Sequence, residues 1–536
     1  MPVANKKSAP LEHKRRLSRS VLWKLQRNYF DRQGIEAWST GAVPHHITSS
    51  PFIADSYARV VFGFLRDCRF AEGGGDQTSV ALDLSQPVHV VELGSGPGRF
   101  AYLFLKKFLG LLRGSALNEL RVRYLMTDFA ERNLEYWRAH AWLRPFVEDG
   151  SLDFALFDAE RNDELTPVIS GEPLSAGSLC NPLVVVSNYF FDSLPQDAFA
   201  VAGGQLFETL VTVSTAQKET DREDPEILSR AEVSYQNSPA EGDYYEDPAW
   251  NRLLEDYRRR LPAASFLFPT AALKCVEYFQ RLSGGRMLML SGDRGYHGDD
   301  AILRGQGTPT MAVHGSFSMM VDYQIVGEHC RHLGGRVIHP SHRHESLNVS
   351  ALLFGDSRDG FAETRQAYAE AVEKFGPDDF FTLKEGVAGV YDSLSPAQLL
   401  AFLRLSGWDY KRFLECLHVF KSHLPELDES QKQELHEAVR RIWDAYLPIG
   451  EQEDLAFHVG TLLLEMEFYG EALEFLQHSL DLYGAEPGTL YNMAVCCHGL
   501  RQTAKAVEHV ERALELDAEF DAAKALRIEL QTSAAR

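Results

Sequence analysis

The sequence has few cysteines, no long apolar segment and no excess of positive charge. Seven cysteines are scattered through 536 residues without a Cys-x-x-Cys pair, which disfavours structural zinc and is typical of a protein in a reduced cytoplasm. No apolar run reaches the roughly 18–20 residues that a bilayer-spanning helix needs. A net charge of −22 argues against a nucleic-acid partner for the whole chain. We therefore expect a cytoplasmic protein without nucleic-acid partner or membrane insertion.

Charge is unevenly distributed along the chain. Residues 1–34 contain nine basic and two acidic residues, and residues 214–248 contain ten acidic and three basic residues. The first segment is interpreted as a basic, flexible arm that leads into a helix over residues 17–30. The second has few large aliphatic residues and is interpreted as a partly disordered acidic insertion. The length of the chain predicts two or three domains.

Three alternating glycines follow a short β-branched segment. Val88 to Leu93 predicts a buried strand, and the loop Gly94-Ser95-Gly96-Pro97-Gly98 connects it to an apolar helix over residues 100–112. Glycine at these positions allows positive φ and a close approach of a ligand to the backbone. Glu92, at the strand end, can accept a hydrogen bond from a ligand amine.

This strand, glycine loop and helix are typical of the nucleotide-binding loop of class I methyltransferases, which bind S-adenosyl-L-methionine (SAM). The dinucleotide pattern Gly-x-Gly-x-x-Gly does not fit the spacing. The N–H groups at the start of the helix favour an anionic group such as the SAM carboxylate. The predicted cofactor-binding residues here are Glu92, Gly94, Ser95, Gly96 and Gly98.

Strand-like and helix-like segments alternate from residue 88 to residue 355. The predicted strands are 88–93, 121–127, 152–157, 183–187, 206–213, 286–291, 336–339 and 347–354, and the predicted helices are 100–112, 130–141 and 250–260. Such alternation predicts an α/β, Rossmann-like domain with a mostly parallel sheet covered on both faces. Ligands of these sheets bind at the carboxyl ends of the strands.

Two further carboxylates follow strands of this predicted sheet. Asp128 closes the second strand, where it can accept from the ribose hydroxyls of SAM, and Asp158 closes the third, where it can meet the adenine amino group. Each is also a favourable residue for capping a helix N-terminus. Their regular placement after the glycine loop leads us to predict both as cofactor-binding residues.

The last part of the chain is predicted to be helical throughout. Small residues recur at an offset of 34, as in Ala438, Ala472 and Ala506, and Gly460 and Ala494 have the same spacing. This period resembles the tetratricopeptide repeat (TPR), in which paired helices cross closely and stack. A plain helical bundle is the alternative. In either case we expect an interaction scaffold whose concave face holds a peptide or a protein partner.

The strand over 183–187 continues into Asn188-Tyr-Phe-Phe-Asp192-Ser-Leu-Pro195. Three more patterns are His46-Ile-Thr-Ser-Ser-Pro51, Gly292-Asp293-Arg-Gly295-Tyr296 and Met320-Val-Asp322-Tyr323. These four patterns occur in an order along the chain that resembles the MidA family of SAM-dependent methyltransferases, which includes the mitochondrial complex I assembly arginine methyltransferase. The resemblance covers about residues 28–355. The corresponding family signatures are Asn-Glu-Phe/Leu-Phe-Asp-Ala-Leu-Pro, Phe-Ile-Thr-Ser-Pro-Glu, Asp-Tyr-Gly-Tyr and His-Val-Asp-Phe.

The resemblance implies methyl transfer to a protein side chain, with arginine as the family precedent. It assigns catalytic roles to Asn188, Asp192 and Asp293, with Asn188 also touching the cofactor. Asp192 is the available proton acceptor. The alternative is a purely structural role for Asp192 as a turn residue before Pro195. One position departs from the family, because Tyr189 stands where the family has a glutamate that would hold a guanidinium. No metal is expected, and His339, His342 and His344 are interpreted as alternating along an exposed strand end.

The predicted organisation has four parts. They are a basic N-terminal arm and helix (1–45), a SAM-dependent methyltransferase domain with the acidic insertion at 214–248 (46–360), a connecting segment (361–394) and a TPR-like helical domain (395–536). The predicted function is methylation of a protein recruited by the helical domain. The alternatives are a small-molecule methyltransferase and a TPR adaptor that binds SAM without turnover.

Overall fold

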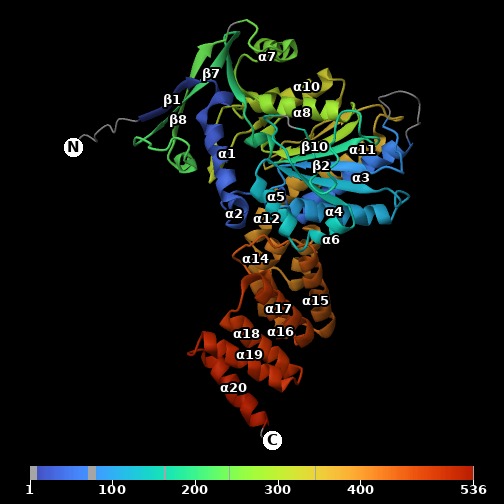
Figure 1. The fold of residues 1–536 in the computed structure, drawn as a ribbon, viewed down its shortest axis with the longest axis vertical. Helices are drawn as coiled ribbons and strands as arrows, with labels where there is room; N and C mark the ends of the chain where they lie inside the picture. The colour runs from blue at the N-terminus through green and yellow to red at the C-terminus, as the bar shows by residue number, and fades with distance from the viewer. Residues whose placement is uncertain (1–8, 71–79, 162–163, 241, 345, 535–536) are drawn as a thin grey trace, which may run out of the picture. The chain divides into compact units, whose positions relative to one another are not determined.

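A computed structural model describes residues 9–70, 80–161, 164–240, 242–344 and 346–534. The chain divides into two compact units between Thr382 and Leu383, and Figure 1 traces the chain through both. The first unit is α/β and the second is helical. The division falls inside the segment 361–394 that the sequence analysis assigned as a connection. The start of this segment belongs to the first unit, since Asp67 of α3 (Pro51–Phe70) accepts from the backbone of α11 (Ala362–Tyr368).

A seven-stranded sheet forms the centre of the first unit. Its strands are β2 (Val88–Leu93), β3 (Val122–Asp128), β4 (Leu152–Leu156), β5 (Leu183–Asn188), β10 (Met287–Asp293), β15 (Arg336–Ile338) and β16 (Asn348–Phe354). The strand order is β15-β16-β10-β5-β2-β3-β4. Strands β10, β5, β2, β3 and β4 are parallel, and β16 is antiparallel to both neighbours. The order reverses between β2 and β5, which creates the crevice where ligands of such sheets bind.

Helices cover both faces of this sheet, which explains why its strands are almost continuously apolar and buried. Figure 1 shows α8 and α10 on one side and α3 and α4 on the other. The other helices of the first unit lie around the sheet and its loops. The helices not yet given are α1 (Val21–Gln33), α2 (Glu36–Ser39), α4 (Arg99–Arg113), α5 (Glu131–Ala139), α6 (Arg144–Glu148), α7 (Pro248–Arg260), α8 (Thr270–Leu282), α9 (Asp299–Leu303) and α10 (Tyr323–His332).

A second, antiparallel sheet was not predicted. It contains β1 (Ala9–Arg15), β6 (Asp197–Ala202), β7 (Gln205–Thr215), β8 (Glu232–Pro239) and β9 (Ala263–Phe268). The strand predicted over 206–213 is β7, so its assignment to the parallel sheet is wrong. Every second residue of β7 is buried from Thr209 onward, which is the pattern of a sheet with one covered face. Two short strand pairs complete the unit: β11 (Gly295–Tyr296) with β14 (Val321–Asp322), and β12 (Ala312–His314) with β13 (Ser316–Ser318).

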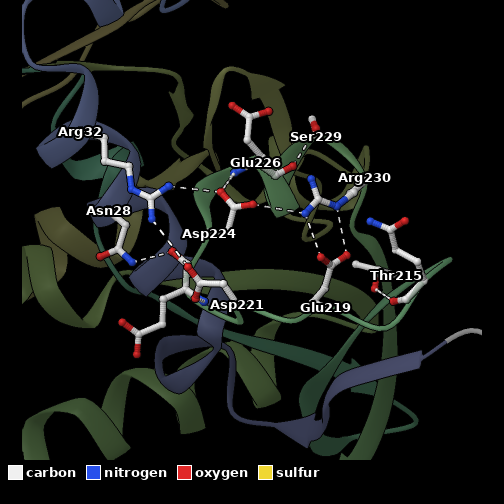
Figure 2. Close-up of polar contacts among 11 residues, drawn as sticks. Asn28, Arg32, Thr215, Glu219, Asp221, Asp224, Glu226, Ser229 and Arg230 are labelled. Atoms are coloured by element: carbon white, nitrogen blue, oxygen red, sulfur yellow. Dashed lines mark hydrogen bonds and ion pairs between the residues drawn. The ribbon is translucent and has the colours of Figure 1, made fainter.

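The basic and acidic segments are folded against each other where the structure describes them. Residues 1–8 of the predicted arm and Glu241 of the predicted insertion lie outside the described residues. The helix predicted over residues 17–30 is confirmed as α1. The residues before it form β1 and the acidic segment supplies β8, so the predictions of a flexible arm and a partly disordered insertion are wrong for the described residues. Figure 2 shows Arg32 of α1 paired with Asp224 at 3.2 Å, and Arg230 with Glu219 at 2.8 Å. The first pair joins the two segments, and the second lies within the acidic segment.

The second unit is a succession of helices. They are α13 (Pro396–Leu405), α14 (Tyr410–His423), α15 (Glu429–Asp444), α16 (Leu455–Glu465), α17 (Tyr469–Tyr483), α18 (Pro487–Gly499), α19 (Thr503–Leu516) and α20 (Asp521–Ala534), and α12 (Pro377–Ala388) spans the boundary between the units. A Cβ at Gly460 would lie 2.9 Å from Leu476, and Ala472, Ala494 and Ala506 are fully buried. The prediction that small residues mark close helix crossings is therefore confirmed.

The remaining sequence expectations concern cysteines and membrane helices. All seven cysteines are free thiols, and only Cys180 is exposed among them. No helix in the described part of the chain combines the length and the apolarity that a membrane crossing requires.

Candidate functional site

A cavity of about 460 Å³ lies at the carboxyl ends of β2 and β5, where the strand order reverses. Small organic ligands commonly bind in cavities of this size. Of the predicted site residues, Glu92, Gly94, Ser95, Gly96, Asp128, Asp158, Asn188 and Asp192 line it. Gly98 and Asp293 are not among its lining residues.

The glycine loop has the backbone that its sequence predicts. Gly94, Gly96 and Gly98 have φ values of 62°, 50° and 77°, a region that side chains with a Cβ rarely occupy. A Cβ on Gly94 would lie 2.8 Å from the Phe190 ring, and one on Gly96 would lie 3.1 Å from Trp38. Gly98 precedes α4, and a Cβ on it would lie 2.7 Å from Met126, so it serves packing rather than the cavity.

Glu92 is a buried carboxyl group at the end of β2. Its side chain is only 3% exposed, and its carboxyl group lies beside the Ser95 and Tyr124 hydroxyls, but its Oε2 makes no hydrogen bond of normal geometry with the described residues. Burial raises the pKa of Glu92 to about 8 because the charged form loses its hydration. A buried carboxyl oxygen without a partner is costly unless a ligand donor satisfies it. An ammonium group is the donor that suits it best, because it would also stabilise the ionised form.

Asp128 and Asp158 follow the two adjacent strands and face the same cavity. Asp128 accepts from Ala130 N and Asn133 Nδ2, both at 3.0 Å, and burial raises its pKa to about 6. Asp158 accepts from Glu160 N at 3.0 Å and from Arg27 at 2.7 Å. Both residues therefore combine a local structural role with a position in the cavity wall. Each carboxylate oxygen retains capacity for a second hydrogen bond.

Asn188 connects the cavity to α3. Its Oδ1 accepts from the hydroxyl of Tyr57 at 2.8 Å, and its Nδ2 is buried without a partner among the described residues. The orientation of the amide is thereby determined by Tyr57, which lies in the helix that follows the His46–Pro51 motif. Because Asn188 lines the cavity, a ligand acceptor could satisfy the N–H groups of its Nδ2.

Asp192 and Asp293 form a pair of buried carboxyl groups. Asp192 lies in the short 3-10 helix Phe191–Ser193 beyond β5, and its backbone N–H donates to Asp293 at 3.3 Å. Burial and the neighbouring Asp293 raise the pKa of Asp192 well above its usual range. Asp293 accepts from Tyr323 at 2.7 Å and from Ser291 at 3.1 Å. Asp192 faces the cavity, whereas Asp293 is fully buried behind it and supports it.

The last two sequence motifs meet beside this pair. Asp322 accepts from Tyr257 at 3.1 Å, and Tyr323 reaches Asp293, so the motif after β10 and the motif before α10 form one polar network. The resemblance gave a catalytic role to Asp293, and the hydrogen bonds connect that residue to the Met320–Tyr323 motif.

The sequence analysis missed the part of the cavity wall that comes from the N-terminal helices. Arg27 of α1 pairs with Asp158 and lies over the Phe129 ring at 4.4 Å, and Trp38 of α2 lies against the glycine loop. No local pattern marks these residues, because Arg27 and Asp158 are 131 positions apart. Arg27 lies in the helix predicted over residues 17–30, to which the sequence analysis gave no role in the site.

Two further residues of the cavity wall, Arg294 and His314, also escaped the sequence analysis. Tyr189 lines the cavity as well, and the sequence analysis had named it only as a departure from the family pattern. Tyr189 has a φ of 47°, which is unfavourable for a residue with a bulky side chain and is typical of functional positions. The one available signal was in the motifs, where Tyr189 departs from the family glutamate.

The histidines after β15 are not on an exposed strand end. The His297 ring stacks on His339 at 5.0 Å and on His344 at 5.5 Å, and burial lowers the pKa of His339 to about 3. Among the residues that the structure describes, no group of three or more histidine, cysteine or acidic side chains could hold a metal ion.

Neither a protein-family model nor a curated protein matches the chain. Three solved structures from Burkholderia thailandensis are similar to it. An uncharacterised ACR protein has 14% identity and a TM-score of 0.40, covering 64% of this chain and 89% of that chain. A likely methyl transferase bound to S-adenosyl-homocysteine, described as a COG1565 superfamily member like the first protein, has 15% identity and a TM-score of 0.37, covering 58% of this chain and 79% of that chain. An O-methyltransferase family protein has 12% identity and a TM-score of 0.25, covering 62% and 69%.

Proposed function

We propose that this chain is a SAM-dependent methyltransferase of the class I, Rossmann-like fold. The observation that carries the proposal is the cavity at the reversal point of the sheet, where the left-handed glycine loop adjoins the buried, partnerless carboxyl oxygen of Glu92. An amino-acid ammonium group satisfies that oxygen. A dinucleotide, whose phosphates are anionic, does not suit a buried carboxyl at this place.

The residues present fit SAM. Glu92 would hold the ammonium group, the backbone of Gly94, Ser95 and Gly96 would adjoin the methionine moiety, and Asp128 would accept from the ribose hydroxyls. Asp158, with Arg27 and Phe129 beside it, would border the adenine. When bound, SAM supplies the electrophilic methyl group.

The chain's own contribution to the reaction is to orient the acceptor and to remove its proton. Asp192 is the carboxyl group that faces the cavity beside Asn188, and its raised pKa makes its ionised form a stronger base. The proton that the acceptor nitrogen or oxygen loses would go to Asp192. Asp293, Tyr323 and Ser291 position Asp192 without touching the substrate. Phe190, Trp38 and the α1 segment exclude water from the reacting atoms.

The family resemblance extends the proposal to a protein side chain as acceptor, recruited by the helical unit and modified in the cytoplasm. The spacing of small residues along α15 to α20 supports a TPR-like scaffold, which commonly binds peptides. Arginine is the acceptor that the MidA family implies. Tyr189 at the family's glutamate position supplies no carboxylate for a guanidinium, so Asp192 is the group left for that purpose.

Calorimetry on the full chain tests the proposal. S-adenosyl-homocysteine and SAM should bind with dissociation constants in the roughly micromolar range, whereas NAD should not bind detectably. Equal binding of NAD would favour a dinucleotide site. Absence of binding by either SAM or its product would refute the methyltransferase assignment.

A further inference from the structure

One cationic side chain in the cavity wall has no partner. Arg294 lies directly beyond Asp293 at the end of β10, is exposed and lines the cavity. No ion pair or hydrogen bond links its guanidinium to any of the residues that the structure describes. By contrast, the other arginine of the wall, Arg27, is paired with both Asp158 and Glu160. Arginines that line cavities without a partner are well suited to bind carboxylate or phosphate groups.

The surroundings of Arg294 leave its charge uncompensated. The ionisable groups that influence it are Asp192, Tyr189 and His314, and none of them lies within ion-pair distance. Asp192 is 2% exposed, and its backbone N–H donates to Asp293 rather than to any group of Arg294. The glycine loop and the carboxylates Glu92, Asp128 and Asp158 belong to the strands β2, β3 and β4, whereas Arg294 follows β10 on the other side of β5.

The sequence motifs point in the same direction. Arg294 stands at the tyrosine position of the family's Asp-Tyr-Gly-Tyr pattern, and Tyr189 stands at the glutamate position of its Asn-Glu-Phe pattern. Both residues line the cavity, and both changes make this end of it more positive. An anionic group on the acceptor would gain from both changes.

We propose that Arg294 is a specificity residue that binds an anionic group, a carboxylate or a phosphate, on the methyl acceptor. The inference rests on the proposed methyltransferase function, because it assigns the β10 end of the cavity to the acceptor and the β2 end to SAM. The planar guanidinium can donate two parallel hydrogen bonds to such a group. A bound anion in this position holds the acceptor beside Asp192. The favoured acceptors are therefore acidic molecules or protein segments that carry an acidic or phosphorylated residue near the methylated atom.

Small probes can test this in the full chain saturated with S-adenosyl-homocysteine. Succinate and inorganic phosphate represent the two anions, succinamide is the neutral counterpart of succinate, and agmatine represents a guanidinium. Calorimetry should show that at least one of the two anions binds about tenfold more tightly than succinamide and agmatine. Arg294→Gln should remove that preference and change the affinity for S-adenosyl-homocysteine by less than about twofold.

Arg304→Gln is the matched control, because Arg304 is exposed in the same unit and does not line the cavity. It should leave every affinity unchanged. Equal binding of the anions and succinamide, or a preference for agmatine, overturns the inference. If Arg294→Gln weakens S-adenosyl-homocysteine instead, the carboxylate that Arg294 holds is that of the cofactor, and the inference is wrong. If the wild-type chain binds no S-adenosyl-homocysteine, the proposed function fails, and the same anion titrations on the unliganded chain still decide the role of Arg294.

Discussion

The two ends of the cavity present different charged groups. At the β2 end, Glu92, Asp128 and Asp158 lie at or just beyond the carboxyl ends of β2, β3 and β4, and the glycine loop lies beside them. At the β10 end are the buried Asp192–Asp293 pair and Arg294, which makes no ion pair with the residues that the structure describes. Glu92 in its ionised form suits the ammonium group of SAM, and Arg294 suits an anion. The difference divides the cavity into a cofactor part and an acceptor part.

The strongest way to break this division is to fill its cofactor part. Gly96→Arg should abolish the binding of SAM and S-adenosyl-homocysteine, because the backbone at Gly96 has a positive φ and a Cβ there would lie 3.1 Å from Trp38. Calorimetry measures the loss. Gly110→Arg is the control, since Gly110 is exposed in α4 with open space around it. A folded Gly96→Arg variant with unchanged SAM affinity would show that the cofactor part is assigned wrongly.

The next largest effect is expected in the acceptor part. Asp192→Asn should keep the SAM affinity and lower turnover by roughly 10²–10⁴-fold, the usual contribution of a positioned proton acceptor. The fold should tolerate the change, because asparagine has nearly the same size and shape as Asp192 and keeps the backbone N–H that donates to Asp293. Turnover with labelled SAM and thermal unfolding measure the two effects. Asp300→Asn, at an exposed position of α9, is the control. Unfolding of Asp192→Asn, or full activity, contradicts the catalytic role.

The helical unit offers a comparison outside the cavity. Deletion of residues 395–536 should leave SAM binding intact and raise the Michaelis constant for a protein acceptor by about tenfold or more, since a tethered partner has a high effective concentration. The catalytic constant should change less. Steady-state kinetics on the physiological protein acceptor measure both. Unchanged kinetics would rule out a recruiting role, and equal activity on a small metabolite would favour the small-molecule alternative.

The last comparison concerns the pH dependence of the cofactor part, whose effect within a single pH unit is expected to be the smallest. Glu92 has a pKa of about 8 in the empty folded protein, above its usual 4.5, so it is protonated at pH 7. An ammonium group needs the ionised carboxylate, and SAM affinity should rise by up to about tenfold per pH unit between pH 6 and 8. Calorimetry in buffers of different ionisation enthalpy would detect the released proton.

Glu92 should have the opposite pH dependence in the stability of the empty protein, which decreases where the SAM affinity increases. A raised pKa contributes stability that is complete below the unfolded value of 4.5 and is lost as pH rises through about 8. Glu92→Gln should remove both pH dependences, and Glu148→Gln, which is exposed, should retain them. A SAM affinity that does not change between pH 6 and 8 contradicts the role of Glu92.

The sequence alone determined the features that depend on neighbouring residues. The strands β2, β3, β4, β5, β10 and β16 lie within two residues of their predicted bounds, because each is an apolar run between turn residues. The positive φ values of the glycine loop follow from glycine itself, and the carboxylates line the cavity because the ends of parallel strands share one edge. The close helix crossings of the second unit follow from small residues spaced 34 apart.

Tertiary structure alone decided the features that join distant segments. The Arg27–Asp158 and Tyr57–Asn188 contacts each span 131 residues, and the pairing of β1 and α1 with the acidic segment spans nearly 200. The composition of such segments predicts flexibility, because it reflects their charge and gives no information on their ion-pair partners. The burial of Asp293 behind Asp192 and the lack of a partner for Arg294 also depend on side chains from several elements. Local propensity cannot specify these contacts, since packing and electrostatics act between groups that only the folded chain brings together.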